Sequence, residues 1–148
     1  MKISVFNRQR SVPFNLPWLK RLAPSALAEC KKHPATGAPE IALAQLEAVE
    51  IIIVSDARIA AIHEQFMNIP GATDVITFEH GEIVISAETA KRNSQDFHQP
   101  IEHELALYVI HGLLHLNGYD DRAPADAKQM RELQEKILSA CLQAVETR

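Results

Sequence analysis

The segment from His111 to Asp121, His-Gly-Leu-Leu-His-Leu-Asn-Gly-Tyr-Asp-Asp, restricts the structure of this 148-residue chain more than any other. His111 and His115 are four residues apart, so a helix places both imidazoles on one face, one turn apart. Gly118 suits the left-handed residue that ends a helix, and it lets the chain reverse toward its own last turn. The carboxylate of Asp121 can then approach the two imidazoles and share one metal ion with them. Two histidines, one carboxylate and an open position are the composition of a catalytic zinc site, which indicates a hydrolase.

The same segment is compatible with less specific roles. The spacing of two histidines is weak evidence alone, because seven histidines in 148 residues produce such pairs by accident on surface or core helices. Asp120 competes with Asp121 for the third position, since a one-residue change in the turn would exchange the two acids. Metalloproteases share the histidine spacing, but they need a glutamate directly after the first histidine as general base. That position is Gly112, which cannot transfer a proton, so a protease is a minor alternative.

Length and composition indicate one ordinary globular domain that spans residues 1–148. The length is close to the commonest domain size, and 47% hydrophobic with 23% charged residues is typical of a soluble protein. No apolar run approaches the roughly 20 residues that cross a bilayer. The first six residues alternate like a strand and lack the apolar region of a signal peptide. Cys30 and Cys141 have no pairing pattern, so we expect reduced core residues in a cytoplasmic protein. A net charge of −4 means that nucleic-acid binding would need local basic patches.

The pattern of hydrophobic residues predicts an α+β fold with about four strands and five helices. One predicted hairpin interrupts any simple parallel alternation, which indicates a mixed four-stranded sheet with the metal site on a central helix and the turn after it. The predicted strands are 2–7, 49–54, 75–78 and 83–85, and the predicted helices are 16–33, 56–67, 87–94, 101–116 and 124–145.

Several boundaries follow from local signals. Asn15 and Asp56 are predicted helix caps, and Pro24 with the following serine suggests a break in the first helix. The two prolines and the glycine among residues 33–39 predict a loop. The second strand could begin as early as Ile41. His80 and the glycine after it could form the turn of the hairpin.

The predicted helix 101–116 has two different faces. Leu105, Val109 and Leu113 recur at helical spacing and should point toward the sheet. Glu104 and Tyr108 share a second stripe with the two histidines, where neighbouring groups orient metal-binding imidazoles. A simple solvent-exposed role for Glu104 is equally compatible with the sequence.

The motif resembles the signature of the YbeY family of bacterial endoribonucleases, which are rRNA maturation factors. That signature reads His-Gly-x-Leu-His-Leu-x-Gly-Tyr-Asp-His, and ten of its eleven positions fit residues 111–121. Residues 73–78, Thr-Asp-Val-Ile-Thr-Phe, are similar to the family's Thr-Asp-Val-Leu-Ser-Phe, and residues 81–86 resemble its Gly-Asp-Ile-x-Ile-Ser. Met130 and Glu135 also match residues of the family's last helix. The resemblance covers about residues 50 to 140.

The resemblance implies a single-domain, zinc-dependent endoribonuclease that acts on single-stranded RNA. It implies a role in 16S rRNA 3′-end maturation and ribosome quality control, with ribosomal RNA and the small ribosomal subunit and its proteins as partners. Carried over by position, the ligands of one zinc ion, or of another divalent ion, are His111, His115 and Asp121. A water on the ion would attack the phosphodiester. Candidate support residues are Tyr108, Glu104 and Asp120, and candidate substrate-cleft residues are Thr73, Asp74, Ser86, Arg58 and Arg92.

This chain departs from the family pattern at two positions. Asp121 replaces the third histidine, which should make the bound water less acidic and make manganese more competitive with zinc. Met67 occupies the position of an arginine thought to face the substrate phosphate, so that charge is either absent or supplied from elsewhere, for example by Arg58 or Arg92. The hairpin at 79–82 is also shorter than usual. Two alternatives therefore remain: a ribosome-associated binding factor with a structural metal, and a metal-dependent hydrolase of a peptide or small molecule.

Overall fold

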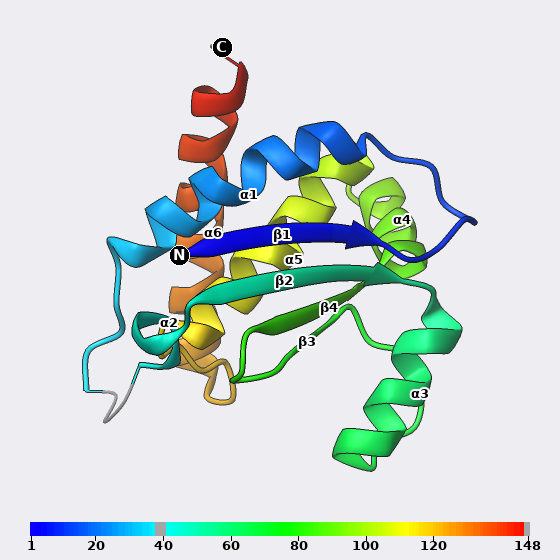
Figure 1. Cartoon of the computed structure of the whole chain (residues 1–148), viewed down its shortest axis with the longest axis horizontal. Helices are drawn as coiled ribbons and strands as arrows, with labels where there is room; N and C mark the ends of the chain where they lie inside the picture. The colour runs from blue at the N-terminus through cyan, green and yellow to red at the C-terminus, as the bar shows by residue number, and fades with distance from the viewer. Residues whose placement is uncertain (38–40, 147–148) are drawn as a thin grey trace.

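The computed structural model describes residues 1–37 and 41–146, and within these ranges the chain forms four strands and six helices (Figure 1). The strands are β1 (Lys2–Asn7), β2 (Ala48–Val54), β3 (Val75–Thr77) and β4 (Glu82–Ser86). The helices are α1 (Leu16–Lys31), α2 (Ala42–Gln45), α3 (Asp56–Met67), α4 (Ala87–Asp96), α5 (Ile101–Leu116) and α6 (Pro124–Glu146).

The four strands form one mixed sheet in the order β1-β2-β4-β3. β1, β2 and β4 are parallel, and β3 runs antiparallel to β4 at the edge. The hairpin closes with a hydrogen bond from the Gly81 nitrogen to the Phe78 carbonyl, 2.9 Å long, so the predicted turn at residues 80–81 is confirmed. The observed architecture confirms the predicted α+β fold with a mixed four-stranded sheet.

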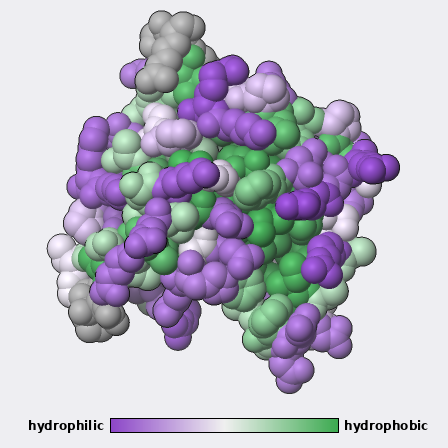
Figure 2. All heavy atoms as spheres, viewed as in Figure 1, coloured by the Kyte–Doolittle hydropathy of each residue, from purple (hydrophilic) through white to green (hydrophobic). Residues whose placement is uncertain are grey.

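Alternate residues of the strands enter two separate cores. Ile51 and Ile53 of β2 join the main core, which α1, α4, α5 and α6 cover. Ile52 and Val54 point the other way and join a small cluster under α3. Because side chains of a strand alternate between its two faces, one face of the sheet is deeply buried and the other carries a single helix. Figure 2 shows hydrophobic side chains reaching the surface beside α3, on this thinly covered side.

α5 is the central helix, as the sequence predicts. Leu105, Val109 and Leu113 are all 0% exposed in the main core. Gly112 lies directly against β4: a Cβ atom added there would be 2.7 Å from Cγ2 of Ile83. The glycine after the first histidine therefore permits close contact between helix and sheet, and there is no room at this position for the glutamate of a metalloprotease.

Two local predictions for the segment between β1 and β2 need correction. α1 continues through Pro24 without a break, because Leu22, Ala23 and Ala26 on either side of it are buried in the core and hold both halves in line. The second strand does not begin at Ile41, which instead precedes the short helix α2, a helix that the hydrophobic pattern did not predict.

A third correction concerns the cap of α3, which is Ser55 rather than the predicted Asp56. The Ser55 hydroxyl accepts a hydrogen bond from the Arg58 backbone nitrogen at 3.2 Å, and Asp56 is the first helical residue. The predicted loop 33–39 is non-helical through Gly37, and its last two residues lie outside the described residues. No helix in the described part of the chain combines the length and apolar character that crossing a membrane requires.

Gly112→Ala should destabilise the protein. The added methyl overpacks against Ile83 at a cost of about 1–3 kcal/mol, which exceeds the gain of about 1 kcal/mol from replacing a helical glycine. Urea denaturation should give a lower free energy of unfolding than for the parent. Ile83→Val removes one of the crowding carbons, so a double-mutant cycle should show favourable coupling between the two changes. A Gly112→Ala variant more stable than the parent would contradict this packing.

Candidate metal centre

The end of α5 and the turn after it bring three metal-binding side chains together. His111 and His115 lie on the last two turns of α5, which ends at Leu116. Gly118 has a φ of 101°, a left-handed conformation that favours glycine. The backbone nitrogens of Gly118 and Tyr119 donate to the carbonyls of His115 and Leu114, at 3.1 and 3.0 Å. This reversal carries Asp121 back to the two imidazoles.

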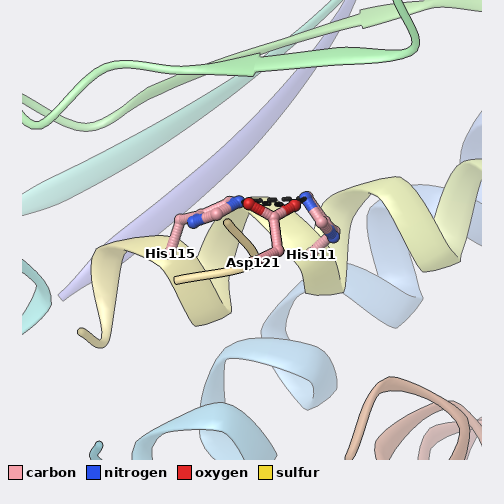
Figure 3. A group of neighbouring side chains, drawn as sticks. All are labelled: His111, His115 and Asp121. Carbon is pink, nitrogen blue, oxygen red and sulfur yellow. Dashed lines mark hydrogen bonds and ion pairs between the residues drawn. The ribbon is translucent and has the colours of Figure 1, made fainter. Parts of the chain in front are cut away.

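The donor atoms of these residues converge on one point (Figure 3). The Nε2 atoms of His111 and His115 are 3.0 Å apart. Oδ2 of Asp121 lies 3.5 Å from the first and 3.7 Å from the second. In a tetrahedral zinc site with bonds of 2.0–2.1 Å, donor atoms are roughly 3.3–3.4 Å apart. The three observed distances bracket this separation, so the donor set fits a zinc-sized ion.

Both imidazoles are oriented through their other nitrogen. Nδ1 of His111 is 2.5 Å from Oε1 of Gln134 on α6, and Nδ1 of His115 is 3.0 Å from the Tyr119 carbonyl. Because both partners are acceptors, each ring carries its proton on Nδ1. The two Nε2 lone pairs then face each other, an arrangement that repels unless a cation lies between them. The two rings are therefore held in the tautomer that binds a metal through Nε2.

The surroundings of His115 favour its neutral form. Burial lowers the pKa of His115, and the neighbouring His111 lowers it further, because both disfavour an imidazolium. Asp121 acts in the opposite direction but is outweighed. A metal competes with protons for imidazole nitrogen, so a lowered pKa keeps the site ready for an ion near neutral pH.

The site lies in the wall of a cleft of about 890 Å³ between α5, the turn after it and the edge strand β3. Met67, Thr73, Asp74, Thr77 and Glu79 line this cleft together with the turn at residues 118–122. Two of the predicted substrate-cleft residues, Thr73 and Asp74, are thus placed beside the metal-binding residues.

The charge in the cleft is mainly negative. Asp74, Glu79, Asp120 and Asp121 all line it. Arg122 is also present, but it is bound to Asp120: its Nε atom is 3.1 Å from Oδ2, and its backbone nitrogen donates to Oδ1 at 3.1 Å. Asp120 therefore binds its neighbour and leaves Asp121 as the acid at the two histidines. A phosphate would need a bound cation to enter this cleft.

The other predicted cleft residues lie elsewhere. Ser86 is buried, and its hydroxyl donates to Oδ1 of Asp56 at 2.5 Å. Arg92 donates to Oδ2 of the same carboxylate at 2.8 Å. Neither of them, nor Arg58, is among the described residues that line the cleft. The burial cost at Asp56 is offset by hydrogen bonds from Ser86, Arg92 and Thr89, which hold its pKa below the usual value. This cluster ties α3 to α4 and does not replace the arginine expected near Met67.

Tyr108 and Glu104 also have partners other than the imidazoles. The Tyr108 hydroxyl accepts from Nδ2 of Asn93 at 2.8 Å and is hydrogen-bonded to Glu104. Glu104 is 8% exposed, so a simple solvent-exposed role is wrong, and burial raises its pKa. The residue that orients the His111 ring is Gln134, and neither Tyr108 nor Glu104 does so. No local pattern predicts this contact, because the two residues are 23 positions apart in the sequence and lie on different helices.

Gln134→Leu should lower the affinity for zinc by roughly 10–100-fold, because losing an acceptor behind a metal-binding imidazole frees the ring to rotate. Competition with a fluorescent chelator measures the change. Gln134→Glu keeps the acceptor and should bind zinc at least as tightly as the parent. Equal affinity of the leucine variant and the parent would show that Gln134 does not orient His111.

Comparisons with known proteins identify the family of this chain. The family model described as Endoribonuclease YbeY matches residues 5–142. A protein of Bacteroides fragilis named Endoribonuclease YbeY is 36% identical over 98 residues, which cover 62% of this chain and 70% of that protein. One of the same name from Nautilia profundicola is 38% identical over 98 residues, 61% and 69% of the two chains. A solution structure of a Thermotoga maritima protein superposes with a TM-score of 0.66 and 26% identity, covering 98% of this chain and 92% of that one. Because the family match spans nearly the whole chain, this chain belongs to the endoribonuclease YbeY family.

Proposed function

We propose that this protein is a zinc-dependent endoribonuclease that cleaves single-stranded RNA during ribosomal RNA processing. The observation that carries the proposal is the convergence of two Nε2 atoms and one carboxylate oxygen in the wall of an open cleft, in a member of an endoribonuclease family. The proposed role includes 16S rRNA 3′-end maturation and ribosome quality control in the cytoplasm. Its proposed partners are ribosomal RNA and the small ribosomal subunit with its proteins.

Each residue of the site has a distinct task in this proposal. When bound, the ion supplies a Lewis acid that activates water and stabilises charge on phosphate oxygens. His111, His115 and Asp121 would hold it, and Gln134 with the Tyr119 carbonyl fix the two rings. Gly112 packs against the sheet and cannot move a proton, so nothing at that position resembles the base of a metalloprotease.

Asp121 adjusts the chemistry of the proposed centre. A carboxylate donates more negative charge than an imidazole, so water activation should be weaker than with three histidines. The rate of cleavage should then rise as the pH increases above neutrality. An oxygen ligand also suits manganese better than a third nitrogen would, so zinc and manganese should both be tested.

His115→Ala should abolish metal-dependent cleavage of single-stranded RNA, because it removes one of the two imidazole donors. His33→Ala, a histidine outside the cleft, is the matched control and should cleave like the parent. The measurement is cleavage of a labelled single-stranded oligoribonucleotide, with zinc content determined by elemental analysis.

The results also separate the alternatives. If His115→Ala loses zinc but cleaves as fast as the parent, the nuclease proposal fails. If the zinc-loaded parent binds the small subunit without cleaving RNA, the binding-factor alternative takes its place.

Met67→Arg should increase cleavage by about tenfold, because it adds a cation to a cleft whose own arginine is paired with Asp120. Met67 lines the cleft and is 50% exposed, so a longer side chain fits without disturbing the core. Met67→Gln is the control of similar length without charge and should cleave like the parent. The gain should shrink as salt increases, since salt screens exposed charges. Equal rates for the arginine and glutamine variants would contradict a role for charge at this position.

A further inference from the structure

Large hydrophobic side chains are exposed on one short segment beside the cleft. Phe66 and Met67 are the last residues of α3, and Ile69 follows the left-handed residue that caps this helix. The three residues are 61%, 50% and 48% exposed. Single exposed hydrophobic residues are ordinary, but several gathered at one place mark a binding surface. Figure 2 shows hydrophobic side chains at the surface over α3.

The Phe66 ring stands at one end of a row of three rings, here called the aromatic row. Its centroid is 5.4 Å from that of Phe78, with the planes at 78°, and the Phe78 ring stacks on that of His80 at 5.5 Å and 21°. Aromatic rings prefer such edge-to-face and stacked arrangements. Phe78 packs against the small cluster under α3, and Nε2 of His80 is 2.7 Å from Oε1 of Glu82. The row is therefore held in place while much of the Phe66 ring stays open to solvent.

The aromatic row borders the cleft that contains the candidate metal centre. Phe66 directly precedes Met67, which lines the cleft. Phe78 lies between Thr77 and Glu79, which line it as well. The same cleft thus reaches the metal-binding residues and the edge of the aromatic row, so one strand of nucleic acid bound along it can contact both.

The charge of the cleft indicates which part of an RNA strand the aromatic row binds. Four carboxylates line the cleft, and Arg122, the only arginine or lysine among the described residues that line it, is paired with Asp120. An uncharged nucleobase can approach such a surface more easily than a phosphate can. Every base has a π face that stacks on an aromatic side chain, and this contact is the usual partner of charge in single-strand binding. In a duplex the neighbouring bases cover those faces, so an aromatic surface selects unpaired RNA.

We propose that the aromatic row of Phe66, Phe78 and His80 is a stacking surface for a nucleobase of single-stranded RNA, with Phe66 as its exposed contact. The inference rests on the proposed nuclease function and adds to it a substrate-positioning element outside the metal centre. The stacked base places the strand along the cleft, and the requirement for a free base face gives the preference for single strands.

Matched variants test the role of the Phe66 ring. Phe66→Leu keeps an apolar side chain and removes the aromatic face, whereas Phe66→Tyr keeps the face. Phe97→Leu is the control, because Phe97 is 68% exposed but is not among the described residues that line the cleft. All three variants retain the candidate metal ligands. We expect Phe66→Leu to lower kcat/KM for a single-stranded oligoribonucleotide by roughly tenfold, and the other two variants to stay close to the parent.

A fluorescence measurement records the stacking itself. 2-Aminopurine, a fluorescent analogue of adenine, loses emission when it stacks on an aromatic ring. A set of oligoribonucleotides carries this base at each position in turn within a run of uridines, whose bases stack weakly on their neighbours. Stopped-flow mixing with the zinc-loaded protein follows binding before cleavage products accumulate. At one position the emission should fall with the parent, Phe66→Tyr and Phe97→Leu, and much less with Phe66→Leu.

The outcomes separate this inference from the proposed function. Cleavage by the parent, with equal quenching and activity in Phe66→Leu, would overturn the inference alone. An equal loss in Phe66→Leu and Phe66→Tyr would overturn it too, because the side chain would then act by packing. Quenching that depends on Phe66 in a parent that does not cleave would support the inference and overturn the proposed function, and the absence of both would overturn both. Self-association of the parent that Phe66→Leu abolishes, with unchanged RNA measurements, would assign the surface to a second copy of the chain instead.

Discussion

The close approach of α5 to β4 at Gly112 sets the geometry of the rest of the molecule. With no side chain at this position, the helix lies directly on Ile83, and its histidine stripe faces the gap beside the edge strand β3. α6 can then pack along α5 closely enough for Gln134 to reach His111. A larger residue would move the helix away from the sheet and displace the two imidazoles from their place in the cleft wall. The residue that excludes protease chemistry is thus also the one that builds the site.

Electrostatics make the proposed function depend on a bound cation. The cleft carries four carboxylates, and its arginine is paired, so the protein alone would repel a phosphodiester. Two imidazole nitrogens that face each other and one carboxylate form a group in this cleft that could hold a cation. A bound ion would attract the phosphate and supply the Lewis acid that activates water, so the proposed function does not require a net positive charge on the protein. The overall charge of −4 is compatible with such a mechanism.

The sequence allowed the convergence of the three candidate metal-binding side chains to be predicted because their geometry is local. Helical spacing, a left-handed glycine and a short turn determine where His111, His115 and Asp121 lie relative to one another. Contacts between distant elements carry no such signal, so Gln134 was missed, and Ser86 and Arg92 were expected in the cleft although Asp56 binds them elsewhere. Pro24 shows the same limit for secondary structure. Its local preference for a break is outweighed by the burial of its neighbours, which only the folded chain reveals.

X-ray absorption spectroscopy at the zinc edge of the metal-loaded protein tests the central claim most directly. Two imidazole nitrogens at about 2.0–2.1 Å and carboxylate oxygen at about 2.0–2.2 Å are the ligands that the structure predicts. Asp121→Ala should remove the carboxylate contribution and leave both imidazoles in place. A spectrum that contains sulfur at about 2.3 Å, or that does not change in the His111→Ala, His115→Ala double variant, would place the ion elsewhere and contradict the account.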